Sequence, residues 1–125
     1  MKPHILVIED EPALLSLIEQ LLTCAGYAVS SAEHGRAAMK ILNDSVVHLV
    51  VTDLVMPEQD GIETIRKIRN LQPSVPIIAM SGGGVIEADR YLKIARALGA
   101  KRLLPKPFAT NMLVEMVREL VGAPE

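Results

Sequence analysis

The fold of this chain is decided by one central stretch, Val50-Val51-Thr52-Asp53-Leu54-Val55-Met56-Pro57. Apolar residues occupy positions 46–51 except at His48, which is the pattern of a strand buried on both faces of a parallel sheet. The run ends at one acid, Asp53, and Pro57 prevents simple continuation of the strand. The stretch therefore predicts a carboxylate at the C-terminal end of a central strand, where open α/β sheets bind ligands. The alternative is that Asp53 caps the next helix or orders a turn.

The rest of the chain alternates between short apolar runs and amphipathic stretches. The runs predict strands at residues 5–8, 27–31, 46–51, 75–80 and 102–104. Apolar residues at helical spacing follow each run, at positions 14–25, 37–42, 62–68, 88–98 and 113–121. This alternation predicts an α/β fold, a flavodoxin-like (βα)5 three-layer sandwich with a parallel five-stranded sheet of order 2-1-3-4-5. The first and third strands then lie side by side at the centre.

Composition excludes several classes of protein. A length of 125 residues allows one domain, and 2% aromatic residues among 50% hydrophobic ones predict an aliphatic core. The net charge of −2 argues against general nucleic-acid binding. The single cysteine, Cys24, rules out an internal disulfide, fits a reducing compartment and, in an apolar helical stretch, is expected in the core. The first residues form neither a signal peptide nor a membrane span, so we expect a soluble cytoplasmic protein.

Polar residues stand at the ends of four predicted strands. Glu9-Asp10 follow the first strand, Asp53 ends the third, Ser81 follows the fourth and Lys106 follows the fifth. These strands are neighbours in the order 2-1-3-4-5, so their ends should meet at one edge. Converging carboxylates repel one another, and a divalent cation removes that repulsion. An all-oxygen ligand set suits Mg²⁺, whereas the cysteine and histidines show no metal-ligand spacing.

Each of these residues also has a structural alternative. Glu9 and Asp10 suit the N-terminus of the following helix, and Ser81 suits that of the fourth helix. Lys106 is, on this alternative, an ordinary solvated loop lysine. However, the prolines on both sides of Lys106 fix its backbone, and a lysine held near carboxylates supplies positive charge for a phosphoryl oxygen. The Ser81 hydroxyl is able to donate to the same oxygens.

Five short motifs carry a family resemblance over essentially the whole chain. They are Glu9-Asp10, the stretch Thr52-Asp53-Leu54-Val55-Met56-Pro57, Asp60-Gly61, Ser81-Gly82 and Lys106-Pro107-Phe108. In this order on this fold, they resemble the receiver domain of two-component response regulators. The resemblance implies a single receiver domain over residues 1–125 without an effector domain, unless the chain is a fragment of a longer protein.

The resemblance implies a phosphorylation-dependent switch in a phosphorelay. Asp53 matches the acid that accepts a phosphoryl group from a histidine kinase or histidine phosphotransfer protein. Lys106 and Ser81 match the residues that bind the phosphoryl group, and the Lys106–Pro107 bond is expected to be cis. Such a domain catalyses only its own phosphorylation and dephosphorylation. The residues that match the family's Mg²⁺ ligands are Glu9, Asp10, Asp53 and the backbone carbonyl of Val55.

Output is expected through docking rather than through nucleic acid or membrane. The expected surface covers the fourth helix, fifth strand and last helix, because residues 90–106 contain six basic residues and no acid. Weak dimerisation is a further expectation. One position departs from the family: Leu103 stands where an aromatic residue is usual, three before the lysine. The switch is therefore expected to run through Ser81 and the following glycines, Gly82, Gly83 and Gly84.

Three other functions remain at this point. One is a pseudo-receiver that binds partners and never takes phosphate. Another is a phosphatase that uses an aspartyl phosphate, although such enzymes carry a second acid where this chain has Val55. The last is a flavodoxin-like cofactor binder, which needs phosphate-cradling loops and flat aromatic side chains. The glycine run 82–84 is no P-loop, because no Gly-Lys-Ser/Thr follows it.

Overall fold

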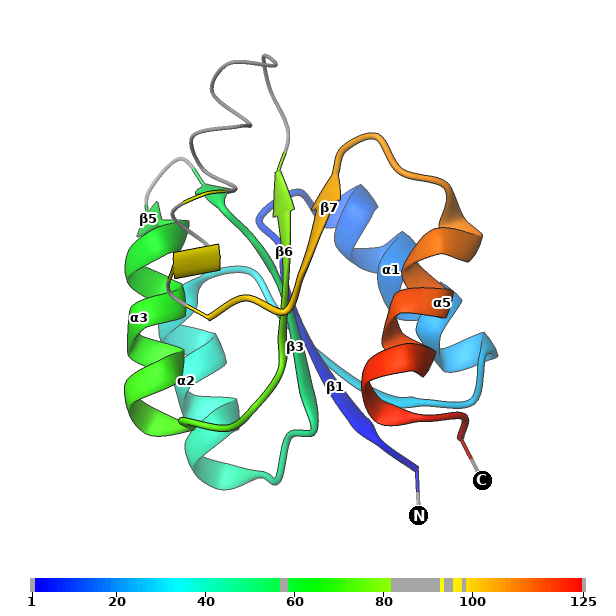
Figure 1. Cartoon of the computed structure of the whole chain (residues 1–125), viewed down its shortest axis with the longest axis horizontal. Helices are drawn as coiled ribbons and strands as arrows, with labels where there is room; N and C mark the ends of the chain where they lie inside the picture. Colours follow the sequence, from blue (N-terminus) through cyan, green and yellow to red (C-terminus); the bar gives the residue numbers. More distant parts are fainter. Residues whose placement is uncertain (1, 57–58, 82–92, 94–95, 98, 125) are drawn as a thin grey trace.

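The computed structural model describes residues 2–56, 59–81, 93, 96–97 and 99–124. Five parallel strands form the main sheet: β1 (His4–Ile8), β2 (Ala28–Ala32), β3 (Leu49–Asp53), β6 (Ile77–Ser81) and β7 (Arg102–Pro105). Their order is β2-β1-β3-β6-β7, which confirms the predicted order 2-1-3-4-5 (Figure 1). Most of the fourth helix expected at 88–98 lies outside the described residues.

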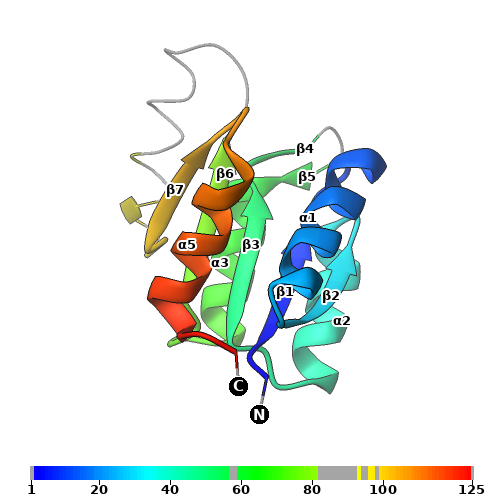
Figure 2. The same cartoon turned by 90° about the vertical axis from the view of Figure 1, so that its right-hand side faces the viewer.

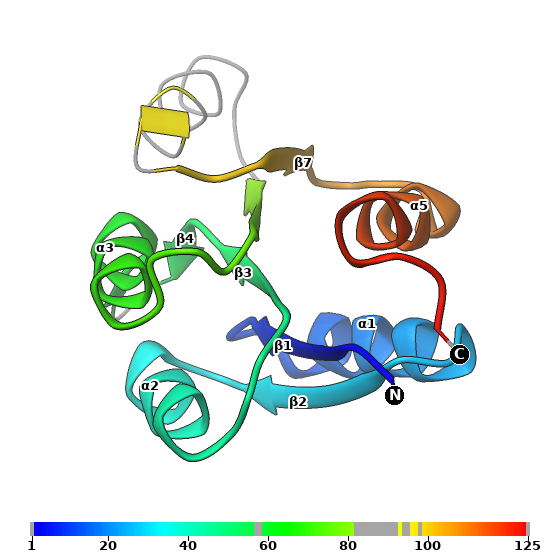
Figure 3. The ribbon, with the colours of Figure 1, turned by 60° about the horizontal axis from the view of Figure 1, so that its bottom comes forward.

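Helices cover both faces of this sheet. They are α1 (Pro12–Cys24), α2 (Gly35–Asp44), α3 (Gly61–Leu71) and α5 (Thr110–Val121). Figure 3 shows α1 and α5 on one face and α2 and α3 on the other, which is the expected three-layer arrangement. In Figure 2 the arrows of β3 and β7 point to one edge of the sheet, and both chain ends lie at the opposite edge.

The core is divided by the sheet because successive strand residues point to opposite faces. On one face, Ile18 of α1 and Leu113 of α5 pack with Ile5 and Val7 of β1. On the other face, Ile65 and Ile68 of α3 lie in a second cluster with Leu6 and Ile8. Each fully buried Leu or Ile stabilises the fold by about 1.5–3 kcal/mol, so the two clusters hold the helices in place.

Several element boundaries differ from those predicted. The strand expected from residue 46 begins at Leu49, and the side chain of Val46 is 76% exposed where the chain crosses from α2 to the sheet. Strand β6 begins at Ile77, after Pro76, which has no N–H for a ladder. A short antiparallel pair, β4 (Val55–Met56) with β5 (Gln59–Asp60), was not predicted and connects β3 to α3.

Cys24 was expected in the core, and this prediction is wrong. Its residue is exposed at the end of α1. The buried positions of this helix are Leu15, Ile18 and Leu22, which recur at helical spacing. A residue two places after Leu22 is rotated by about 200° to the opposite side of the helix, because an α-helix has 3.6 residues per turn.

Candidate functional site

The site lies at the C-terminal edge of the sheet, where four strand ends meet as expected. Glu9 follows β1, Asp53 ends β3, Ser81 ends β6 and Lys106 follows β7. The two last strands are joined here, because the Lys106 N–H donates to the Ser81 carbonyl oxygen at 2.6 Å. Glu9, Asp53 and Ser81 are only 1–3% exposed. The fold thus brings two carboxylates, a hydroxyl and an ammonium group together in a largely buried site.

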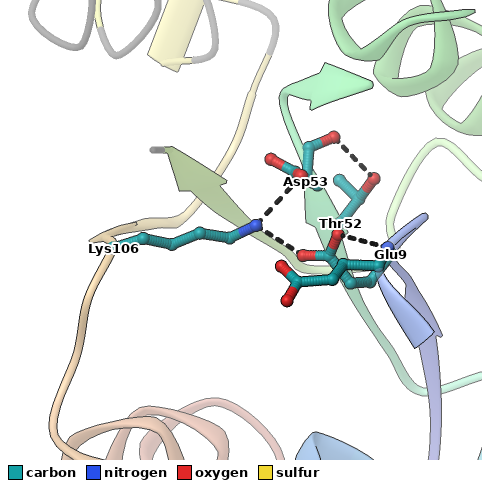
Figure 4. A network of polar contacts seen from close by, with 5 residues as sticks. Glu9, Thr52, Asp53 and Lys106 are labelled. Atoms are coloured by element: carbon teal, nitrogen blue, oxygen red, sulfur yellow. Dashed lines mark hydrogen bonds and ion pairs between the residues drawn. The ribbon is translucent and has the colours of Figure 1, made fainter. Parts of the chain in front are cut away.

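Lys106 is held between the two buried acids. Its Nζ donates to Glu9 Oε1 at 2.5 Å and to Asp53 Oδ2 at 3.0 Å (Figure 4). Its side chain is 19% exposed, so the alternative of a solvated loop lysine is wrong. The Lys106–Pro107 peptide bond is cis, as the family resemblance implied.

Burial and pairing set the protonation of this group. Burial raises the pKa of Glu9, and the hydrogen bonds from Lys106 and the Glu11 N–H offset this only in part. Burial alone would lower the pKa of Lys106, but the bonds to Glu9 and Asp53 outweigh burial and raise it. Lys106 is therefore held as a cation at neutral pH.

The acids also form a group suited to a metal ion. One carboxylate oxygen from each of Glu9, Asp10 and Asp53 lies within 4.8 Å of the others. Helix capping does not account for this group of acids. The N-cap residue of α1 is a different acid, Glu11, and its side chain makes no capping hydrogen bond. Glu9 Oε2 accepts a hydrogen bond from the Glu11 N–H at 3.1 Å. Among the described residues, three carboxylates and the ammonium group of Lys106 gather here, which leaves negative charge for a cation, and oxygen donors fit Mg²⁺.

Ser81 has an unusual hydroxyl. Within the described part of the chain, its Oγ is buried and has no hydrogen-bond partner. Buried polar atoms almost always have a partner, and an unpaired one costs about 1–3 kcal/mol. By contrast, the buried hydroxyl of Thr52 donates to the Asp53 carbonyl at 3.2 Å (Figure 4). A buried, unpaired donor beside Asp53 and Lys106 suits an anion bound at this edge. The helix that Ser81 was alternatively expected to cap lies largely outside the described residues.

Two further points concern the predicted residues. Val55 lies in β4, two residues after Asp53, as a ligand through its backbone would require. Sequence reasoning did not foresee that Lys106 pairs with Glu9 as well as lying near Asp53. The excess of acids predicted at this edge could have indicated the contact, because a lysine nearby is attracted to each of the carboxylates.

Comparison with known proteins agrees with this geometry. The model of the response regulator receiver domain family matches residues 5–118. This chain belongs to that family. The transcriptional regulatory protein CpxR of Klebsiella pneumoniae subsp. pneumoniae is 37% identical over 117 residues, which are 94% of this chain and 48% of CpxR. This receiver chain spans about half, or less, of the length of the curated relatives it matches.

Solved structures support the same fold. A response regulator receiver domain protein from Clostridium thermocellum is 27% identical, with a TM-score of 0.86 and coverage of 95% of this receiver and 94% of that chain. The chemotaxis protein CheY4 of Vibrio cholerae is 23% identical, with a TM-score of 0.85 over 97% of this receiver and 100% of that chain. The receiver is thus a signalling domain with a CheY-like flavodoxin fold. No described helix is long and apolar enough to cross a bilayer.

Proposed function

We propose that this receiver accepts a phosphoryl group on Asp53 from the phosphohistidine of a histidine kinase or histidine phosphotransfer protein. The observation that carries the proposal is the buried Asp53 carboxylate, with the Lys106 ammonium 3.0 Å away and an unpaired Ser81 hydroxyl at the end of the next strand. This arrangement favours the proposal over a pseudo-receiver, because a buried carboxylate, an ammonium group and a hydroxyl lie at the ends of neighbouring strands. Among the described residues, no second acid follows Asp53 as in aspartyl-phosphate phosphatases, because Val55 stands there.

The reaction is a phosphoryl transfer between two nucleophiles. An Asp53 carboxylate oxygen attacks phosphorus, a P–O bond forms, the P–N bond to histidine breaks and the imidazole leaves. Such transfer depends on positioning and on neutralisation of the phosphoryl oxygens. Lys106 would move from Asp53 Oδ2 to a phosphoryl oxygen, and the Ser81 hydroxyl would donate a hydrogen bond to another phosphoryl oxygen. Hydrolysis of the aspartyl phosphate by water would reset the domain.

Glu9, Asp10, Asp53 and the Val55 carbonyl would hold Mg²⁺. The three carboxylate oxygens that lie within 4.8 Å of one another support this assignment. When bound, the ion would neutralise charge on the phosphoryl oxygens. Among the described residues, this group has three carboxylates and the single ammonium group of Lys106, which supports a bound cation here.

Mass spectrometry after incubation with phosphoramidate and Mg²⁺ tests the proposal. We expect one added phosphoryl group on the wild-type chain and none on Asp53→Asn. The control is Asp44→Asn, which changes an exposed acid at the end of α2 and should leave labelling intact. Labelling that survives in Asp53→Asn, or is absent from the wild type, would overturn the assignment.

We further propose that output runs by docking of an acidic partner near β7 and α5. Exposed Lys93, Arg96 and Lys101 support this surface. Two members of the predicted basic patch do not belong to it: Lys106 is directed into the site, and Arg102 pairs with Glu119 at 2.8 Å. Arg90 lies outside the described residues. Weak dimerisation stays a prediction.

A further inference from the structure

Arg69, in the last turn of α3, makes an unusual set of contacts at the edge of the sheet opposite the phosphorylation site. Its Nη1 donates to the carbonyl oxygens of Pro73 at 2.9 Å and Val75 at 2.7 Å, and its Nη2 donates to that of Gly99 at 3.0 Å. One guanidinium therefore joins the end of α3, the turn before β6 and the turn before β7. Arginine suits this role, because its planar fork presents several donors in a fixed geometry.

The two carbonyls on β6 and β7 are related by the register of the sheet. Ile78 of β6 lies opposite Arg102 of β7. Val75 and Gly99 each stand three residues before a member of that pair, so they are opposite one another where the ladder begins. The guanidinium thus bridges two backbone positions that would face one another if the register of β6 and β7 continued three residues before the Ile78–Arg102 pair.

The bridge replaces a rung that the ladder lacks. Bonds in a parallel ladder repeat every two residues, and the Lys101 N–H donates to the Ile77 carbonyl at 2.8 Å. One repeat earlier, the Gly99 N–H would donate to the Val75 carbonyl. Instead, the Gly99 N–H donates to the Arg96 carbonyl at 3.0 Å, and the Val75 carbonyl accepts from Arg69.

We propose that Arg69 is a positioning residue for the phosphoryl site, which locks the register of β7 on β6. The inference rests on the proposed function of Lys106 and Ser81. Within the described sheet, β7 is an edge strand that pairs with β6 and with no second strand. Lys106 follows β7 directly, and a slip of one residue would move it by about 3.3 Å and reverse the faces of the strand. Such a displacement would break its contacts with Glu9 and Asp53.

The lock predicts a selective change in amide hydrogen exchange. Arg69→Lys keeps the positive charge, but a lysine ammonium group lacks the planar fork that bridges the Val75 and Gly99 carbonyls. This change should speed exchange of the Lys101 and Lys106 amides about tenfold. The Leu54 amide, which donates to Met80 across β3 and β6, should be unchanged. Arg66→Gln is the matched control, because Arg66 lies on the same helix and is 58% exposed.

A second variant disturbs the same contact from β7. A Cβ on Gly99 would lie 3.3 Å from Arg69 Nε, and Gly99 has a φ of +97°. Gly99→Ala should therefore give the same selective exchange pattern, whether or not an Arg69 variant folds. Equal acceleration at Leu54 and Lys101, or no acceleration at all in either variant, would overturn the lock.

Phosphorylation kinetics test the link to the site. With phosphoramidate, Arg69→Lys should be phosphorylated about tenfold more slowly, because Lys106 is displaced. Its Mg²⁺ affinity, followed through the Asp10 and Asp53 amide signals, should not fall, because these ligands lie at the ends of β1 and β3 and a displaced Lys106 no longer competes with the ion for Glu9 and Asp53. An equal loss of Mg²⁺ affinity, or an unchanged rate, would contradict the positioning role. A wild-type chain that takes no phosphoryl group would defeat the proposed function alone, and the exchange result would still decide the lock.

Discussion

At the residue scale, the most informative atom is the Oγ of Ser81, which is buried and has no hydrogen-bond partner among the described residues. Removing this hydroxyl should not lower the unfolding free energy of the unphosphorylated protein, because no hydrogen bond is lost and an unsatisfied polar group is removed. We expect Ser81→Ala to leave the unfolding free energy unchanged or to raise it by about 1 kcal/mol. Urea unfolding would measure this.

The matched control is Thr52→Val, which removes a buried hydroxyl that does donate, to the Asp53 carbonyl. This change should lower the unfolding free energy by about 0.5–1.5 kcal/mol. If Ser81→Ala destabilises the protein as much as Thr52→Val, then the Ser81 hydroxyl has a partner and our account of it is wrong.

A second prediction at this scale concerns Glu9, whose pKa is raised above 4.5, chiefly by burial. A raised pKa means that the folded state binds the proton more tightly than the unfolded state. This contribution to stability is therefore fully present below pH 4.5 and is lost as pH rises through the folded pKa. With EDTA present, the stability of Glu9→Gln relative to wild type should improve as pH rises above 4.5.

Melting temperature against pH would test this, with exposed Glu33→Gln as the control. The Glu33 variant should track the wild type. A Glu9→Gln advantage that shrinks with rising pH would have the wrong sign and would mean that Lys106 outweighs burial at Glu9.

At the element scale, β7 presents adjacent leucines to opposite faces of the sheet. Leu104 is fully buried among α1 and α5 residues, whereas Leu103 is half-buried against the α2 and α3 face. We expect Leu104→Ala to cost about 2–5 kcal/mol and Leu103→Ala about half as much. Urea unfolding of the two variants would measure the difference.

Leu103 also tests how the switch works. Leucine has no ring to turn inward, so the response to beryllofluoride should pass through the backbone of Ser81 instead. Leu103→Ala should therefore keep the chemical-shift change of the Ser81 amide that beryllofluoride induces in the wild type. Loss of that change in Leu103→Ala alone would give Leu103 a direct part in switching.

At the scale of the whole molecule, Mg²⁺ should stabilise the fold by binding only the folded state. At a concentration about 100-fold above its Kd, the gain is about 2.7 kcal/mol. Asp53→Asn should melt at a higher temperature than wild type in EDTA, because one of three converging carboxylates loses its charge while Lys106 keeps an oxygen acceptor. Thermal melts with and without Mg²⁺ would show both effects. A wild-type melting temperature that does not change on addition of Mg²⁺ would contradict the metal site.

The sheet order and the proximity of Glu9, Asp53, Ser81 and Lys106 could be predicted from the sequence, because local sequence patterns show the alternation of strands and helices and the ends of the strands. Individual side-chain contacts could not be predicted, because they depend on tertiary packing. Whether Lys106 faces solvent or Glu9 depends on how the sheet brings the ends of β1 and β7 together across β3 and β6, and these two residues are 97 positions apart in the sequence. Val46 was placed in a strand because its apolar character gives no sign of where β3 begins to pair.

The two-sided core has a consequence for how substitutions combine. Ile18 and Ile68 belong to separate clusters on opposite faces of the sheet. In a double-mutant cycle, Ile18→Val and Ile68→Val should be additive within about 0.5 kcal/mol, whereas Ile18→Val and Leu113→Ala, within one cluster, should show a coupling energy above that value. The sheet thus separates the two clusters energetically. A substitution in the core of one helical layer should not require a compensating substitution in the core of the other.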